Sequence, residues 1–145
     1  MGMQALGRTF NAQYLMKGKY VNLKNVAGVA FLNYLTGAAG DTYTLTEAKD
    51  ASGTGAQVLA TITEYWTCTG DGSDTWTKRT QASGSTIITA AAATQNCALF
   101  EVQGVELSDG YKYVKVASTG AGLTIAIHTN LLVQRSPGNL TAMGV

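Results

Sequence analysis

The chain of 145 residues is long enough for one domain with its own core, and a hydrophobic share of 46% excludes a disordered polypeptide. Charged residues make up only 13%, and a net charge of +1 excludes strong electrostatic binding to nucleic acid or an anionic membrane, which needs clustered Lys and Arg. A free domain usually keeps more charge to resist self-association. Either the protein works at low concentration, or much of its surface lies against another molecule. We expect no direct nucleic-acid contact and no membrane insertion.

The first half of the chain alternates apolar and polar residues with the period of two that is typical of β-strands. Strands are predicted at 19–26 and 28–36, and the second is placed in the centre of a sheet because it is apolar on both faces. A third is predicted at 41–49, where threonines alternate with Tyr43 and Leu45. Threonine is β-branched, which suits a pleated surface and disfavours a helix.

Two tryptophans mark a predicted hairpin in the middle of the chain. Its arms are residues 62–69 and 73–80, which carry Trp66 and Trp76 and flank a Gly-Asp-Gly turn. The segment that follows, 85–93, fits either a strand, because of its isoleucines, or one helical turn, because of its four alanines.

The last third of the chain predicts strands at 97–104, 111–118 and 122–135. In the first of them, the alternate apolar positions that begin with Ala98 are expected to face the core. The segment between the other two contains glycines and has hairpin length, so these two strands are expected to pair with each other.

The final strand shows the clearest alternation. Leu123, Ile125 and Ile127 share one face, and His128 lies on the other face, which indicates a half-buried strand.

About eight strands, at most one short helix and regularly spaced Gly-rich turns predict an all-β protein. We expect a single β-sandwich, jelly-roll-like or β-barrel domain at 18–135. The ends carry scattered apolar residues without a period. They predict an extended N-terminal arm at 1–17 and a C-terminal tail at 136–145.

Candidate catalytic and metal-binding residues lack partners of the right kind. The single histidine, His128, has no Gly-x-Ser-x-Gly nucleophile motif to serve and no Cys or His at ligand spacing, so we interpret it as a surface or half-buried strand residue. Asp71 and Asp74 hint at calcium, but the EF-hand spacing is absent, and Asp beside Gly is also typical of a tight turn.

The segments 53–55 and 120–122 resemble halves of phosphate-binding loops, but they lack the third glycine, a following Lys-Ser/Thr pair and a helix. Lys78 and Arg79, beside Trp76, form the one adjacent basic pair, which we interpret as a strand end rather than a site for single-stranded nucleic acid. We therefore predict no catalytic, cofactor-binding or metal-binding residues, and no enzyme.

Cys68 and Cys97 make a poor disulfide framework. Because no secretory signal is recognisable at the start of the chain, we expect synthesis in a cytoplasm and two reduced, packed thiols. A disulfide between neighbouring strands is the alternative.

Over roughly residues 18–135, the chain resembles the decoration (cement) proteins of tailed-bacteriophage capsids. The similar features are the strand pair and Gly-Ala turn within 21–57, the loop pattern A-x-x-A-S-G-T-G-A at 48–56, the Trp-bearing arms at 64–81, the strand pattern D-G-Y-x-Y-V-x-V at 109–116, and the long last strand.

This resemblance implies a non-enzymatic virion protein, made in the host bacterial cytoplasm and attached to the outer capsid surface. It would bind the major capsid protein and neighbouring copies of itself, and members of this group often sit as trimers, although monomeric forms occur. The two arms would then order on the shell, and removal of 1–17 would weaken attachment while leaving the fold intact.

Two other function classes fit the same sequence. One is another virion component, a tail-tube or head-fibre subunit. The other is a carbohydrate-binding or adhesion module, in which Trp66, Trp76 and the tyrosines would stack on sugars.

Overall fold

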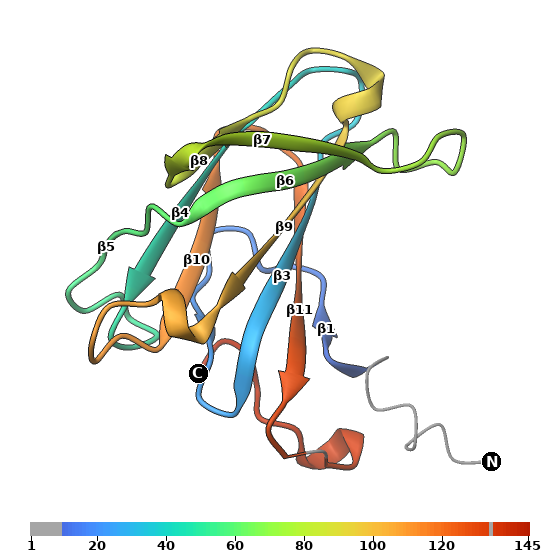
Figure 1. Ribbon diagram of the computed structural model, residues 1–145. Coiled ribbons are helices and arrows are strands. Elements are labelled where there is room, and N and C mark those ends of the chain that lie inside the picture. The colour runs from blue at the N-terminus through green and yellow to red at the C-terminus, as the bar shows by residue number, and fades with distance from the viewer. Residues whose placement is uncertain (1–9, 134) are drawn as a thin grey trace.

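Two antiparallel β-sheets packed face to face make up the chain over residues 10–133 and 135–145, the part that this computed structural model describes (Figure 1). The predicted all-β class is confirmed, and of the three expected architectures the structure shows the sandwich.

The larger sheet has six strands, in the spatial order β1 (Ala12–Gln13), β11 (Leu123–Leu131), β3 (Val26–Tyr34), β9 (Cys97–Gln103), β6 (Ile62–Cys68) and β7 (Thr77–Gly84). The smaller sheet has five, in which β2 (Val21–Asn22), β10 (Tyr113–Ser118), β4 (Thr42–Ala48) and β5 (Gln57–Val58) follow one another and β8 (Thr86–Ile88) also pairs with β4. Three short 3-10 helices complete the described part: η2 (Ala93–Gln95), η3 (Gly104–Glu106) and η4 (Pro137–Asn139).

More strands are present than the eight or so expected, because β1, β2, β5 and β8 are only two or three residues long. Such short segments show no period in a sequence. The ambiguous segment at 85–93 contains both predicted features in part, since β8 lies within it and η2 begins at its last alanine.

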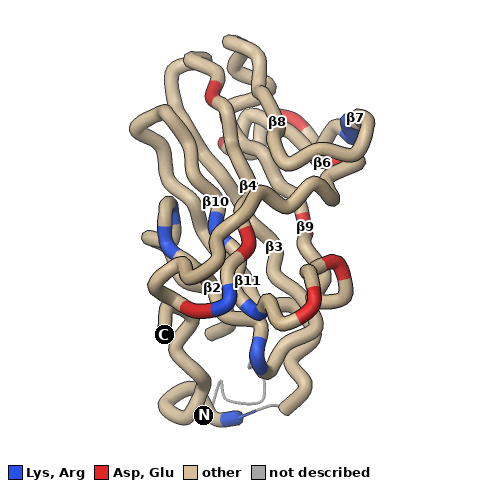
Figure 2. The backbone as a smooth tube through the Cα atoms, turned by 90° about the vertical axis from the view of Figure 1, so that its left-hand side faces the viewer, with Lys and Arg blue, Asp and Glu red and all other residues tan. Residues whose placement is uncertain are grey.

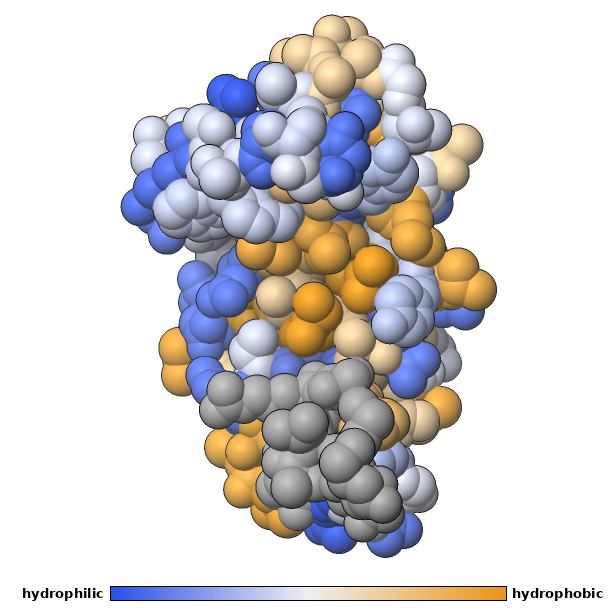
Figure 3. All heavy atoms as spheres, turned by 90° about the vertical axis from the view of Figure 1, so that its right-hand side faces the viewer, coloured by the Kyte–Doolittle hydropathy of each residue, from blue (hydrophilic) through white to orange (hydrophobic). Residues whose placement is uncertain are grey.

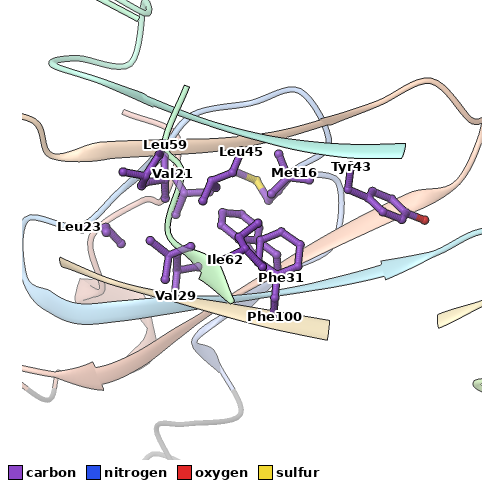
Figure 4. Close-up of a cluster of buried hydrophobic side chains, with 14 of the residues drawn as sticks. Met16, Val21, Leu23, Val29, Phe31, Tyr43, Leu45, Leu59, Ile62 and Phe100 are labelled. Carbon is purple, nitrogen blue, oxygen red and sulfur yellow. The ribbon is translucent and has the colours of Figure 1, made fainter. Parts of the chain in front are cut away.

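The core lies between the sheets and follows the predicted alternation in several strands. In β4, Tyr43 and Leu45 are buried, while the threonines that alternate with them are half-buried on the other face. In β9, the positions that begin with Ala98 are buried, as predicted. Figure 4 shows the rings of Phe31 and Phe100 together in this core, with their centroids 5.8 Å apart. β3 lies in the interior of its sheet, between β11 and β9, as expected for a strand that is apolar on both faces.

The predicted hairpin between residues 111–118 and 122–135 is wrong, because β10 and β11 belong to different sheets. β10 pairs with β4 and β2, and the connecting loop crosses from one sheet to the other. Asp41 holds this crossing by accepting hydrogen bonds from the Gly120 amide (3.0 Å) and the Thr119 hydroxyl (3.1 Å). Gly120 and Gly122 therefore allow this loop to pack closely against Asp41 and Tyr34, rather than forming a hairpin turn.

The expectation that both ends stand apart from the core also differs from the structure. β1 pairs with β11, and Met16 is buried in the hydrophobic core. At the other end Met143 is buried in the same core, and the Asn22 side-chain amide donates to its carbonyl (3.0 Å). One buried methionine in each end segment gives no period that a sequence could reveal. Residues 1–9 of the expected arm lie outside the described residues.

Candidate interaction surface

The last strand turns its larger apolar side chains away from the core. Thr124 and Ala126 are fully buried between the sheets, whereas Leu123, Ile125 and Ile127 are half-buried on the outer side. Between the sheets, the Thr124 hydroxyl donates a hydrogen bond to the Asn33 side-chain oxygen at 2.7 Å. An exposed group of large apolar side chains is more informative than a buried one, because soluble monomers seldom leave such patches uncovered.

Strand register extends these side chains into a row across four strands. Ile125 lies opposite Leu32, Leu32 opposite Leu99, and Leu99 opposite Trp66. Residues directly opposite in antiparallel strands point to the same face, so these four side chains form what we call the apolar row. Figure 3 shows the hydrophobic patch across the middle of this side of the molecule.

Acidic side chains flank the apolar row. A groove of about 360 Å³ is lined by Trp66 and Leu99 together with Glu64, Glu101 and Glu106. Glu64 and Glu101 are exposed. Lys78 is ion-paired with Glu64 and lies over the Trp66 ring, 5.9 Å from its centroid, so the net negative charge of the groove comes from Glu101 and Glu106. The acidic end of the row is therefore suited to a partner that brings both apolar surface and positive charge.

The opposite broad face of the sandwich, formed by the smaller sheet, carries lysines over tyrosine rings. The distances from ammonium nitrogen to ring centroid are 5.2 Å for Lys24 and Tyr113, 5.5 Å for Lys49 and Tyr111, and 4.5 Å for Lys115 and Tyr20. We call these six residues the lysine–tyrosine face. Figure 2 shows its blue segments around β2 and β10. Cation–π contacts hold each charge in place without neutralising it.

His128 does not lie on the surface or half-buried, as predicted, but is buried on the core side of β11. Its Nε2 donates to the Asn22 carbonyl at 2.9 Å, and it lines a pocket of about 250 Å³ between the two ends of the chain. Burial lowers the pKa of His128, and the bond to Asn22 offsets only part of that effect. The ring is thus a neutral, packed group at neutral pH.

Asp71 and Asp74 come together in the turn between β6 and β7. The Thr69 hydroxyl lies 2.6 Å from an Asp71 oxygen and 2.7 Å from an Asp74 oxygen, so its single proton can be donated to either carboxylate. Hydrogen bonds from Ser73 and Thr69 lower the pKa of Asp71 to about 2. Within residues 10–133 and 135–145, no group of three or more His, Cys, Asp or Glu residues is placed to hold a metal ion.

The loop at 53–55 and the basic pair Lys78 and Arg79 form hydrogen bonds or ion pairs within the protein. In the loop at 53–55, the Asp50 carboxylate accepts from the Thr54 amide at 3.0 Å and fixes a local turn. Lys78 pairs with Glu64, and Arg79 donates from Nε to the Thr67 hydroxyl at 2.8 Å.

The two cysteines face each other across neighbouring strands, as Cys68 of β6 lies directly opposite Cys97 of β9. Both are buried and both are free thiols in this structure. Burial and the nearby Cys68 raise the pKa of Cys97 to about 12, so it holds its proton. The pair therefore packs as two small apolar groups.

No protein family, curated protein sequence or solved structure matches the chain. None of the helices in the described part of the chain is long and apolar enough to cross a membrane.

Proposed function

We propose that this protein is a non-enzymatic structural component of a virion, bound to the outer surface of a tailed-bacteriophage capsid. There it reinforces contacts between major capsid protein subunits and lies beside further copies of itself. It is made in the cytoplasm of the host bacterium. The sequence resemblance over 18–135 supports this assignment.

One structural observation carries the proposal furthest. The apolar row consists of large side chains on the solvent side of a sheet, in a chain with only 13% charged residues. A surface of this kind is suited to being covered by protein. Decoration of a shell places a subunit in such a setting, with neighbours on several sides.

The energetics of a shell suit weak individual contacts. Many copies act on one particle, and a subunit that touches several neighbours gains from effective concentration without needing a large interface. Because the net charge is only +1, identical copies approach one another with little repulsion.

Co-sedimentation with purified undecorated heads tests the proposal. We expect saturable binding to heads and none to isolated tails or to heads that are already decorated. Binding to tails alone would indicate the tail-tube or fibre alternative. Binding to neither particle would contradict the proposal.

A carbohydrate-binding module is the second candidate, because Trp66 and Trp76 are 36% and 44% exposed on the β6–β7 hairpin. Exposed tryptophans offer flat faces for sugar rings. Glycan-array binding that is lost in Trp76→Ala would favour this function. The capsid proposal expects no glycan binding by the wild type or by the variant.

A further inference from the structure

The two broad faces of the sandwich carry opposite charge. On the side of the larger sheet, Glu64, Glu101 and Glu106 line the groove at the end of the apolar row, and Lys78 offsets the charge of Glu64 alone. On the opposite side, the lysine–tyrosine face presents three ammonium groups. A net charge near zero thus conceals a molecule with an acidic side and a basic side.

These lysines keep their charge available for a partner. Among the described residues, the ion pair within 4 Å joins Lys78 to Glu64, so Lys24, Lys49 and Lys115 have no carboxylate at that distance. Glu47 of β4 is buried and accepts from the Ser108 amide at 2.9 Å. Asp50, next to Lys49 in sequence, accepts from the Thr54 amide at 3.0 Å.

We propose that the apolar row and acidic groove of one copy pack against the lysine–tyrosine face of the next copy. Each side supplies what the other lacks: the groove offers the carboxylates of Glu101 and Glu106, and the lysine–tyrosine face offers ammonium groups. Charge complementarity within one chain makes a second copy the natural occupant.

The contact is heterologous, because it joins two different faces of the same molecule. These faces lie on opposite sides of the sandwich, as Figures 2 and 3 show from opposite directions. A heterologous contact leaves one free face of each kind at the ends of a chain of copies, so it continues until a ring closes or a surface stops it. The inference rests on the part of the proposed function that places copies side by side, and it does not depend on which shell they cover.

Sedimentation velocity of the purified protein, from micromolar to millimolar concentration, tests the contact. We expect the mass to rise above that of a monomer with concentration, and the association to weaken in high salt because the charges are at the surface. Glu101→Lys and Lys115→Glu reverse one charge on each face and should each weaken association by about tenfold. Gly138→Lys, which adds a positive charge at an exposed position of η4 where a side chain meets nothing within 4 Å, should not.

A mixture of the two charge-reversed proteins provides the decisive arm. In the mixture, the unaltered groove of Lys115→Glu can meet the unaltered lysine–tyrosine face of Glu101→Lys. A heterologous contact therefore predicts that the equimolar mixture associates more strongly than either variant alone. Circular dichroism and thermal unfolding would show that both variants are folded.

Three results would overturn the inference: a wild-type monomer at every concentration, no effect of Lys115→Glu, or no recovery in the mixture. The second result would mean that copies meet through the apolar row alone. Head binding by a protein that stays monomeric would leave the proposed function standing, whereas self-association without head binding would remove the function and keep this contact.

Discussion

Gly122 lies at the tightest point of the crossing between the two sheets. A Cβ atom there would lie 2.2 Å from the Tyr34 carbonyl oxygen, whereas a Cβ at Gly138 would meet nothing within 4 Å. Overpacking against backbone forces the chain to shift, so we expect Gly122→Ala to lower the free energy of unfolding by about 2 kcal/mol or more. Gly138→Ala should change it by less than about 0.5 kcal/mol. Urea unfolding measures both, and equal effects would contradict the packing described.

Protonation of His128 is expected to destabilise the fold. Its folded-state pKa is lowered from 6.5 by burial, so just below that pH the unfolded chain binds a proton that the folded chain does not. Stability linked to this group is therefore present above pH 6.5 and is lost as the pH falls toward the folded-state pKa.

Unfolding free energies of the wild type and His128→Gln between pH 7.5 and about 5 test this sign. We expect the difference between the two proteins to shrink as the pH falls, because only the wild type loses the histidine contribution. Asp41 and Glu47, whose pKa values are lowered, titrate below this window in both proteins. A difference in unfolding free energy that grows on acidification would show that protonated His128 stabilises the fold.

At the residue scale, the sequence predicts roles that depend on near neighbours better than roles that depend on distant ones. The turn at Asp71 is an example, because the groups that bind its carboxylate lie two residues away. The glycine at 122 is required by Tyr34, which is distant in sequence, and nothing local distinguishes it from a hairpin glycine.

At the scale of elements, β11 offers a direct check on which side faces the core. Ala126→Leu adds volume to a fully buried position and should cost about 1–3 kcal/mol. Ile125→Thr keeps a β-branched side chain on the outer side and should cost less than about 1 kcal/mol. The opposite ranking in chemical denaturation would mean that the strand faces the other way.

The C-terminal segment is expected to contribute to stability. Met143 is buried in the core, whereas Val145 is 67% exposed. We expect Met143→Ala to lower the free energy of unfolding by about 2 kcal/mol or more, because it leaves a cavity between the sheets. Val145→Ala serves as the control and should be nearly neutral. Equal effects on the thermal midpoint would show that the segment is not anchored.

Alternation along a strand predicts which residues share a face, but not which face is inside or which strand is the neighbour. Both limits appear here. β9 buries its predicted face and β4 buries Tyr43 and Leu45. β11 buries the face with fewer large apolar residues, where Thr124 donates a hydrogen bond to Asn33. β10 pairs with β4, far away in sequence, rather than with β11, which follows it.

At the scale of the whole molecule, composition indicates a covered surface but does not locate it. The apolar row exists only through the register of four strands, so no single segment reveals it. The same holds for the separation of charge, since lysines that meet on one face come from β10 and from the residues that follow β2 and β4. The proposed position on a capsid shell explains both the low charge content and the apolar row.

A reconstruction of the intact particle tests the central claim most directly. The account predicts density for this sandwich on the outer surface of the head, at junctions between major capsid protein subunits, with the apolar row covered by a neighbouring protein. A head that carries no such density, or a sandwich found only in the tail, would contradict it.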